Sequence, residues 1–348
     1  MKLGEIGRDS KNKSHFSIPK NKIMMAVSKK VLVSWDIPQI GIDMLEGAGL
    51  SATVWKGEQP LSQSELIAMA QEHDALLSQS TDKLDEAFFE ACGHLEVISQ
   101  FSVGYDNINL AKAKACGIPF GNAPGAMTEA TADIAFGLMI ATSRKFFYMH
   151  KKIVAGEWKI QKPQAHLGLD LRGKTLGIFG LGKIGSEMAR LCKAAYGMEI
   201  IYTNRSEAPS VYEKDLQAQK VSFDTLLEQS DVVSVHAGLN TETRGIFDAK
   251  AFAQMKSTAI FINAARGGIH NETDLIHALE NGVIWGAGLD VTNPEPMQAD
   301  NKLLSMETVC VLPHIGSATI GARNNMARMS AENIVSFYEN GVLPYLVE

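Results

Sequence analysis

The sequence predicts an α/β protein with two domains, the larger a doubly wound parallel sheet and the smaller an α/β unit that precedes it. Two observations support this fold class. The chain has 348 residues, 45% of them hydrophobic, so it can form more than one core. Short runs rich in Val, Ile, Leu and Ala also alternate with helical patterns, as expected of buried parallel strands with helices on both faces.

The smaller unit begins with a strand at residues 29–35, followed by a helix in "IGIDMLEGAG". Further strands are expected at 74–80 and 95–102, and "NLAKAKACGI" is typical of a helix that ends at Gly117. A long apolar helix is then expected from Thr128 to Ile153. The strands of the larger sheet follow as six short apolar runs: "KTLGIFG", "EIIYTN", "DVVSVHA", "TAIFINAA", "GAGLDV" and "TVCVLPH".

Composition excludes several classes of partner. The net charge of −6 and the pI near 5.9 argue against a nucleic-acid or anionic membrane surface, so a small-molecule partner is expected. The four cysteines are far apart and show no Cys/His ligand spacing, which predicts reduced thiols, no metal site and a cytoplasmic protein. No apolar stretch reaches the roughly 18 residues that span a membrane, and no signal peptide precedes the first strand. Residues 1–28, rich in Lys, Asn and Ser, are predicted to be a disordered tail.

A glycine-rich loop lies between a strand and an amphipathic helix. It contains Gly180, Gly182 and Gly185, and the helix starts with Lys183 and Ile184. Backbone amides at such a helix start can hold a pyrophosphate. The glycines alone would also fit a simple tight turn, but their position favours a Rossmann-type, dinucleotide-binding domain.

The next strand, in "IIYTNRSE", ends in Asn204, Arg205 and Ser206, where a carboxylate for the ribose 2′-hydroxyl of NAD would be expected. A carboxylate would repel the 2′-phosphate of NADP, whereas Arg205 can pair with it and its two neighbours can donate hydrogen bonds. The sequence therefore predicts that NADP(H) is preferred. The alternative is that Arg205 lies on a solvated loop while Asn204 serves the ribose hydroxyls, which keeps NAD(H) possible.

Polar residues follow three strands of the same sheet. Arg266 ends "AIFINAAR", Asp290 ends a strand in "GAGLDVTNPEP" with Glu295 just beyond it, and His314 ends "VCVLPH". Separately they fit a surface charge, loop acids and a structural histidine. Together, at the edge where ligands of doubly wound sheets bind, they supply a carboxylate anchor, an acid/base and an orienting group.

From about Val31 onward the chain resembles the D-isomer-specific 2-hydroxyacid dehydrogenase family, and most of all its glyoxylate/hydroxypyruvate reductases. The resemblance lies in five motifs in the family's order and spacing: "SVGYDNINL", "GKTLGIFGLGKIG", "NAARGG", "GLDVTNPEP" and "LPHIGSAT". One departure is Gly238, where the family usually has a proline, so the loop that contains it is expected to be looser than in other members.

The resemblance implies the roles of the site residues. Arg266 would bind the substrate carboxylate, His314 would be the acid/base and Glu295 would pair with that histidine. Asp290 would lie near the nicotinamide carboxamide, and Thr128 would face the cofactor. The backbone amides of Val103 and Gly104 would also hold the substrate carboxylate.

The resemblance also implies the architecture. The C-terminal helix would return to close a flavodoxin-like substrate domain made of residues 29–126 and 317–348, while residues 127–316 would form the dinucleotide-binding domain. The apolar helix from Thr128, with Met139, Phe146 and Phe147, is consistent with a homodimer, although packing within one chain would explain it equally well.

The activity expected from the resemblance is NADPH-preferring reduction of glyoxylate and hydroxypyruvate to 2-hydroxy acids. Two other functions stay open at this point. One is a dehydrogenase of the 2-ketogluconate or 3-phosphoglycerate type, and the other is a non-catalytic, dinucleotide-sensing scaffold on the same fold.

Overall fold

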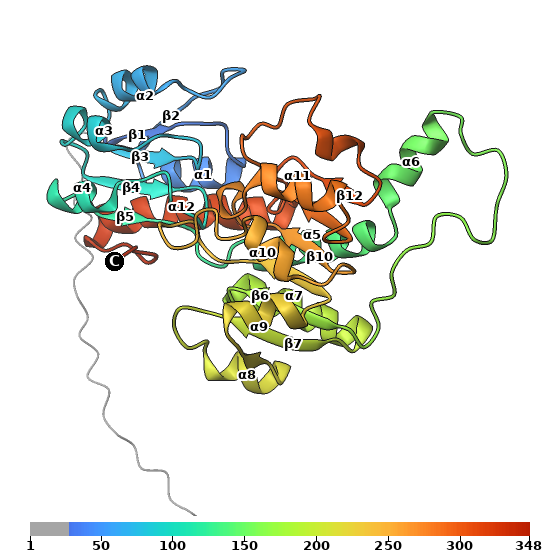
Figure 1. Cartoon of the computed structure of the whole chain (residues 1–348). Helices are drawn as coiled ribbons and strands as arrows, with labels where there is room; N and C mark the ends of the chain where they lie inside the picture. Colours follow the sequence, from blue (N-terminus) through green and yellow to red (C-terminus); the bar gives the residue numbers. More distant parts are fainter. Residues whose placement is uncertain (1–27) are drawn as a thin grey trace, which may run out of the picture.

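The computed structural model describes residues 28–348, which form two parallel sheets with helices on both faces of each (Figure 1). The tail predicted for residues 1–28 lies outside the described residues except for Ser28, whose hydroxyl donates to the carbonyl of Gly49 at 2.8 Å. No helix in the described part of the chain is long and apolar enough to cross a membrane.

The first sheet has five strands in the order β2-β1-β3-β4-β5. Their bounds are β1 Lys30–Val33, β2 Ser51–Val54, β3 Ala75–Ser78, β4 Val97–Gln100 and β5 Phe120–Gly121. The strand order reverses between β1 and β3, as in flavodoxin-like sheets, so a ligand site is expected outside the carboxyl ends of these two strands. The helices on this sheet are α1 Gln39–Gly47, α2 Gln63–Ala70, α3 Glu86–Ala91 and α4 Leu110–Ala115.

The second sheet has seven strands in the order β12-β11-β10-β9-β6-β7-β8. Their bounds are β6 Thr175–Phe179, β7 Glu199–Thr203, β8 Gln219–Lys220, β9 Val232–Val235, β10 Ile260–Asn263, β11 Gly286–Leu289 and β12 Val309–Val311. The reversal between β6 and β9 gives the doubly wound Rossmann order, which confirms the predicted fold class. The flanking helices are α7 Lys183–Tyr196, α8 Ser210–Leu216, α9 Phe223–Gln229, α10 Ala249–Gln254 and α11 Glu272–Glu280, with 3₁₀ turns η1 Gly267–Ile269 and η2 Lys302–Ser305.

Both faces of both sheets are buried, which explains why most strands are continuous apolar runs. Alternate residues of β6, Leu176 and Ile178, face a cluster that includes α5 and α7, while Phe179 joins the cluster on the opposite face. In the first sheet, Val31 and Val33 face one cluster and Leu32 faces the other. Removal of this apolar surface from water is the main stabilising contribution to such sheets.

The prediction of a single helix from Thr128 to Ile153 is wrong, because the chain forms two helices, α5 Thr128–Ser143 and α6 Phe146–Val154. The carbonyl of Ser143 accepts from the amide of Leu169 at 3.0 Å, so it is not used in a continued helical ladder. Lys145 then takes a left-handed conformation with φ of 58°. Its ammonium pairs with Glu307 at 2.7 Å and lies over the ring of Trp285.

The last helix, α12 Ile320–Asn340, returns to the first sheet and packs against α1 and β4. Buried Ser330 donates to the carbonyl of Gln100 at 2.9 Å. Buried Asn333 donates to Ser99 Oγ at 3.1 Å and to the carbonyl of Asn122 at 3.0 Å. Residues more than 200 positions apart are therefore joined by buried side-chain hydrogen bonds.

Candidate active site

The glycine loop after β6 has the shape that a bound pyrophosphate requires. Gly180 has φ of 103°, and a Cβ at this position would lie 2.7 Å from the amide nitrogen of Ala237. A Cβ at Gly185 would lie 2.4 Å from the carbonyl oxygen of Gly180, so the helix packs closely on the loop. Gly182 caps the N-terminus of α7, and a Cβ there would meet nothing within 4 Å. The open side of the loop therefore fits the phosphates of a dinucleotide.

The first two residues of α7 face different hollows. Ile184 lines the largest cavity at the site, which has a volume of about 610 Å³. Lys183 lines a neighbouring hollow together with Thr128. The residue of α5 that lines the larger cavity is Thr131, whose hydroxyl donates to the carbonyl of Gly316 at 3.0 Å.

In the segment after β7, residues 204–206, one side chain is hydrogen-bonded to the glycine loop and the other two are exposed. Asn204 Oδ1 accepts from the amide of Leu181 at 2.6 Å, so this side chain holds the glycine loop against the end of β7. The Arg205 side chain is 80% exposed, lines the 610 Å³ cavity and lies 3.6 Å from the carboxylate of Glu242. Ser206 is exposed beside it. The guanidinium is therefore free to move toward an anion at the cavity mouth.

The 610 Å³ cavity is lined by loops from the carboxyl ends of strands of both sheets. Val103, Gly104 and Asp106 come from the loop after β4. The second sheet contributes loops that follow β9, β10, β11 and β12, with His236–Asn240, Ala264–Arg266, Asp290 and His314. The structure thus brings seven of the predicted site residues to one cavity: Val103, Gly104, Ile184, Arg205, Arg266, Asp290 and His314.

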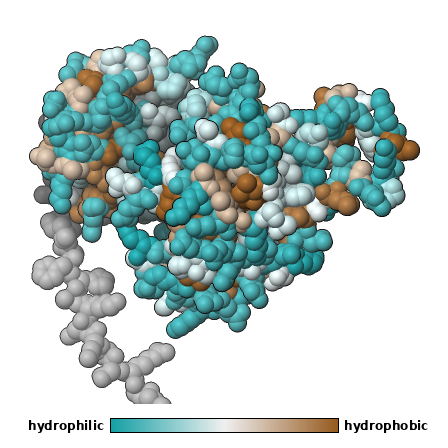
Figure 2. All heavy atoms as spheres, viewed as in Figure 1, coloured by the Kyte–Doolittle hydropathy of each residue, from teal (hydrophilic) through white to brown (hydrophobic). Residues whose placement is uncertain are grey.

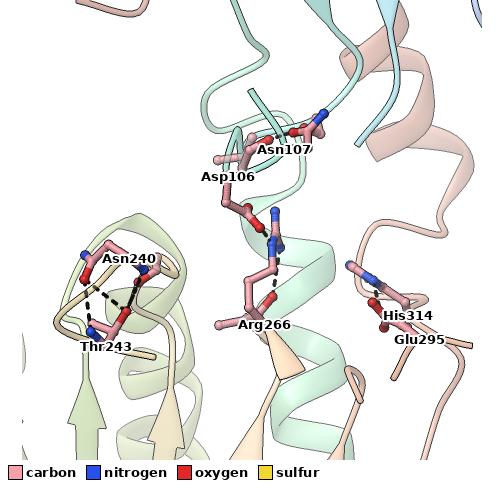
Figure 3. A network of polar contacts seen from close by, with 12 residues as sticks. Asp106, Asn107, Asn240, Thr243, Arg266, Glu295 and His314 are labelled. Carbon is pink, nitrogen blue, oxygen red and sulfur yellow. Dashed lines mark hydrogen bonds and ion pairs between the residues drawn. The ribbon is translucent and has the colours of Figure 1, made fainter. Parts of the chain in front are cut away.

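The guanidinium of Arg266 is fixed from two sides. Its Nε donates to Asp106 Oδ1 at 2.8 Å, and its Nη1 donates to the carbonyl of Ala265 at 2.8 Å (Figure 3). A Cβ at Gly104 would lie 1.8 Å from Nη2, so a side chain at this position would displace the guanidinium from its present place. The Asp106 partner could not be found from the sequence motifs, because the two residues are 160 positions apart.

A buried network shapes the turn on which Arg266 lies. Asn263 Nδ2 donates to the carbonyl of Arg266 at 2.9 Å, and Asn263 Oδ1 accepts from the amide of Ala265 at 3.0 Å. Burial lowers the pKa of His270 to about 4, so the imidazole is neutral at pH 7 and its Nδ1 can accept from Asn263 at 3.0 Å. Sequence reasoning missed both Asn263 and His270.

His314 and Glu295 form the second polar pair at the cavity (Figure 3). His314 Nδ1 lies 3.2 Å from Glu295 Oε1, and the side chains are 43% and 41% exposed. His314 has φ of 53°, a left-handed conformation that is uncommon for residues other than glycine and is often found at functional sites. The backbone holds the imidazole in place through this strained turn.

Asp290 anchors the loop that contains His314. Its Oδ1 accepts from the amide of Ile315 at 2.8 Å, and its Oδ2 accepts from the amide of Gly316 at 2.7 Å. The side chain is 1% exposed, and desolvation raises the pKa of this carboxyl above its ordinary value. Both carboxylate oxygens are therefore used within the loop.

The loop that contains Gly238 is closed by its own side chains. The hydroxyl of Thr243 donates to the carbonyl of Gly238 at 2.8 Å, and the amide of Thr243 donates to Asn240 Oδ1 at 3.0 Å (Figure 3). At the start of the same loop, burial lowers the pKa of His236 to about 4, and its Nε2 lies 2.8 Å from Ser234 Oγ. Side-chain hydrogen bonds thus constrain this loop in the absence of a proline.

Comparisons with known proteins agree with this geometry. Residues 136–316 match the family model described as "D-isomer specific 2-hydroxyacid dehydrogenase, NAD binding domain". A glyoxylate reductase from Korarchaeum cryptofilum is 39% identical over 319 residues, which are 91% of this chain and 95% of the relative.

Two solved structures share the fold. A glyoxylate reductase from Paecilomyes thermophila has a TM-score of 0.83 and 34% identity, and the match covers 92% of this chain and 98% of that one. An NADPH-dependent glyoxylate/hydroxypyruvate reductase from Sinorhizobium meliloti, in complex with NADP and malonate, has a TM-score of 0.80 and 28% identity, with coverage of 92% and 97%.

The fold and the site thus define an oxidoreductase that uses NAD(P) and acts on a small molecule. The chain belongs to the D-isomer-specific 2-hydroxyacid dehydrogenase family.

Proposed function

We propose that this enzyme reduces the small 2-oxo acids glyoxylate and hydroxypyruvate to 2-hydroxy acids, with NADPH as the preferred cofactor. The observation that carries the proposal is that Arg266 and His314 line one cavity with Ile184 of the glycine loop, and that Glu295 contacts His314 at 3.2 Å. The relatives named above as glyoxylate or glyoxylate/hydroxypyruvate reductases support the choice of substrates.

Substrate binding depends on Arg266. Its Nε and Nη1 are already engaged, which leaves the remaining guanidinium N–H groups next to Gly104 for a carboxylate. The backbone amides of Val103 and Gly104 would hold the same carboxylate. A fixed guanidinium fork places the 2-oxo group reproducibly and makes the reaction effectively unimolecular.

The bound nicotinamide would supply the hydride. His314 would donate a proton to the carbonyl oxygen as the hydride reaches the carbon atom, so the product carries one new C–H bond and one new O–H bond. Glu295, 3.2 Å from Nδ1, would orient the ring so that Nε2 faces the substrate, and its charge would stabilise the imidazolium. In the oxidation direction the neutral imidazole would accept the proton.

The cofactor preference follows from the end of β7. Arg205 is the charged group that could meet a 2′-phosphate, and its exposed guanidinium is 3.6 Å from Glu242, a loose contact that a phosphate could replace. Ser206 would add a hydroxyl donor. Asn204 would act by holding the glycine loop through Leu181. Asp290 would act near the nicotinamide through the His314 loop that it anchors, and Thr128 would face the cofactor from the hollow that it lines with Lys183.

The two sheets and the exposed helix α6 support two further parts of the proposal. We propose that residues 29–126 with 317–348 form the substrate domain and that residues 127–316 form the cofactor domain.

The arm made of residues 146–169 projects from the rest of the molecule (Figure 1) and exposes apolar side chains (Figure 2), among them Phe146, Ile153, Val154, Trp158, Ile160 and Leu167. We propose that this arm forms a homodimer interface.

A turnover assay tests the function directly. The purified enzyme is given glyoxylate or hydroxypyruvate with either NADPH or NADH, and the loss of absorbance of the reduced cofactor is followed. We expect turnover of both acids and a higher kcat/KM for NADPH than for NADH. Binding of NADPH without turnover of any 2-oxo acid would contradict the proposal and would indicate a dinucleotide-sensing protein.

A further inference from the structure

A second cavity, of about 320 Å³, adjoins the first on the substrate side. It shares Gly104, Arg266 and His314 with the 610 Å³ cavity, so it opens onto the residues that would face the reacting carbonyl. Its other walls follow the carboxyl ends of β1 and β3, with Trp35 after β1 and residues 79–81 after β3. This is the point where the strand order of the first sheet reverses and where ligands of such sheets bind.

The lining of this second cavity is basic and rich in donors. It contains the side chains of Arg266, His314 and Arg323 and no carboxylate. Arg266 is paired with Asp106 and His314 with Glu295. No ion pair between residues 28–348 involves Arg323, which is the one uncompensated positive charge of the lining.

The contacts of Arg323 leave most of its N–H groups available. Its Nε donates to the carbonyl of Ser317 at 3.2 Å, and its guanidinium carbon lies 5.9 Å from the ring centre of Phe101. Desolvation lowers the pKa of Arg323, which reflects the loss of hydration at a half-buried site. A guanidinium has only donors, so a ligand that completes this site must bring an acceptor.

A second, independent donor lines the same cavity. Gln79 Nε2 is buried and has no hydrogen-bond partner within the described part of the chain. Buried amide groups are nearly always paired, and an unpaired one costs free energy unless a ligand or an ordered water satisfies it. Ser80 and Thr81, both exposed residues with hydroxyl side chains, follow directly in the same wall.

We propose that Arg323 and Gln79 form a subsite for an oxygen atom on C3 of the 2-oxo acid. The inference rests on the proposed function and adds that, among substrates with a third carbon, the enzyme prefers those whose C3 carries a hydroxyl or carboxylate oxygen. An alkyl group at C3 would displace water from both donors without replacing its hydrogen bonds. Glyoxylate, which has no C3, would leave this cavity to water.

The test compares substrates that differ at C3. The kcat/KM values of the wild type and of Arg323→Met are measured with glyoxylate, pyruvate and hydroxypyruvate, all with NADPH. The wild type should prefer hydroxypyruvate to pyruvate, which lacks only the hydroxyl. In Arg323→Met this preference should fall by about tenfold or more, the loss expected for one charge-assisted hydrogen bond, while glyoxylate should change less than about threefold.

Two further variants separate recognition from loop support. Gln79→Met should lower the preference for hydroxypyruvate in the same direction, and Arg323→Lys should restore part of it because an ammonium still donates. Arg328→Met serves as the matched control, because Arg328 lies on the same helix, pairs with Glu332 at 3.4 Å and is absent from this cavity. It should leave the preference unchanged.

Each contrary result has a distinct meaning. If Arg323→Met lowers kcat/KM equally for glyoxylate and hydroxypyruvate, Arg323 only supports the His314 loop through Ser317, and the subsite is wrong. If the wild type has the same kcat/KM for pyruvate as for hydroxypyruvate, the C3 oxygen is not recognised and the inference is overturned. If the wild type reduces neither glyoxylate nor hydroxypyruvate, the proposed function fails, and the subsite fails with it.

Discussion

Arg266 is oriented before any substrate arrives, because Asp106 and the carbonyl of Ala265 hold two edges of its guanidinium. Asp106 lies in the loop after β4 and Arg266 in the loop after β10, so the contact also fixes the distance between these two loops. A lysine could keep one such contact but could not present a planar fork to a carboxylate.

Arg266→Lys should therefore lower kcat/KM for 2-oxo acids by about tenfold to a hundredfold, the value of one lost charge-assisted hydrogen bond. The dissociation constant of NADPH, measured by quenching of tryptophan fluorescence, should change less than about twofold. Turnover at the wild-type level in this variant would exclude a carboxylate-binding role for Arg266.

Glu295→Gln keeps the size of the side chain but removes the charge that lies 3.2 Å from His314 Nδ1. The glutamine can still accept a hydrogen bond from Nδ1, but this bond is weaker than one to a carboxylate and orients the ring less firmly. We therefore expect kcat for the oxo acid to fall by about tenfold in steady-state kinetics, with little change in KM. A wild-type kcat in Glu295→Gln, with turnover abolished in His314→Ala, would show that the histidine is catalytic and that Glu295 does not support it.

Arg205→Ala removes the exposed guanidinium at the end of β7. A contact with the 2′-phosphate contributes about 1.5–3 kcal/mol as a charge-assisted hydrogen bond, so KM for NADPH should rise by about tenfold or more. KM for NADH, which has no 2′-phosphate, should change little. An equal rise for both cofactors would show that Arg205 does not read the phosphate.

Sequence reasoning identified the residues that follow strand ends in recognisable motifs, such as Arg266 and His314, because parallel strands present their carboxyl ends at one edge. Asp106 and Asn263 lie within two of these motifs, but their contacts cannot be read from the motifs themselves, and Arg323 lies outside the motifs. The partner of Asp106 is 160 positions away, and Arg323 lines a cavity between distant loops, so no periodicity records these contacts.

At the scale of elements, the apolar strands were predictable, including β12 at one edge of the second sheet, while β2, β5 and β8 were not. β2 and β8 lie at sheet edges and contain exposed residues, and β5 is two residues long, so none shows a continuous apolar run. The break between α5 and α6 was missed because the bond from Leu169 to the carbonyl of Ser143 comes from a loop, while both helices are apolar in sequence.

The arm made of residues 146–169 yields a prediction about assembly. Trp158 and Ile153 are 71% and 53% exposed, so replacing both with aspartate should leave the fold of one chain unchanged while opposing burial of the arm against a second copy. Sedimentation velocity should show a dimer for the wild type and a monomer for the double variant, with the same circular dichroism spectrum. Ile320→Asp, at an 85% exposed isoleucine outside the arm, is the control and should remain dimeric.

At the scale of the whole molecule, buried His270 and half-buried His236 link stability to pH. Burial lowers the pKa of His236 and of His270 to about 4 in the folded chain, whereas an unfolded chain takes up these protons near pH 6.5. The stability that depends on these two imidazoles being neutral is therefore fully present above pH 6.5 and is lost as the pH falls toward 4. Each histidine should lower the free energy of unfolding by about 2 kcal/mol between pH 7 and pH 5.

Denaturant unfolding of His236→Gln and of His270→Gln at the two pH values measures this effect, and each variant should lose less stability on acidification than the wild type. The carboxyl of Asp82, whose pKa desolvation raises to about 6, has the opposite dependence and is present in all the proteins compared. Exposed His150→Gln is the control. An unchanged pH dependence of stability in both His236→Gln and His270→Gln would contradict this account of the two histidines.

The cytoplasmic location of the protein stays a prediction from composition.

The return of α12 to the first sheet has a consequence for how the chain is made. Asn333 and Ser330 complete hydrogen bonds of Ser99, Gln100 and Asn122, which leave the ribosome more than 200 residues earlier. The seven-stranded sheet is built from residues 175–311 and has all its strands before α12 emerges. During synthesis the nucleotide-binding half should thus mature first, while the earlier-made half waits for its last helix with part of its apolar surface uncovered.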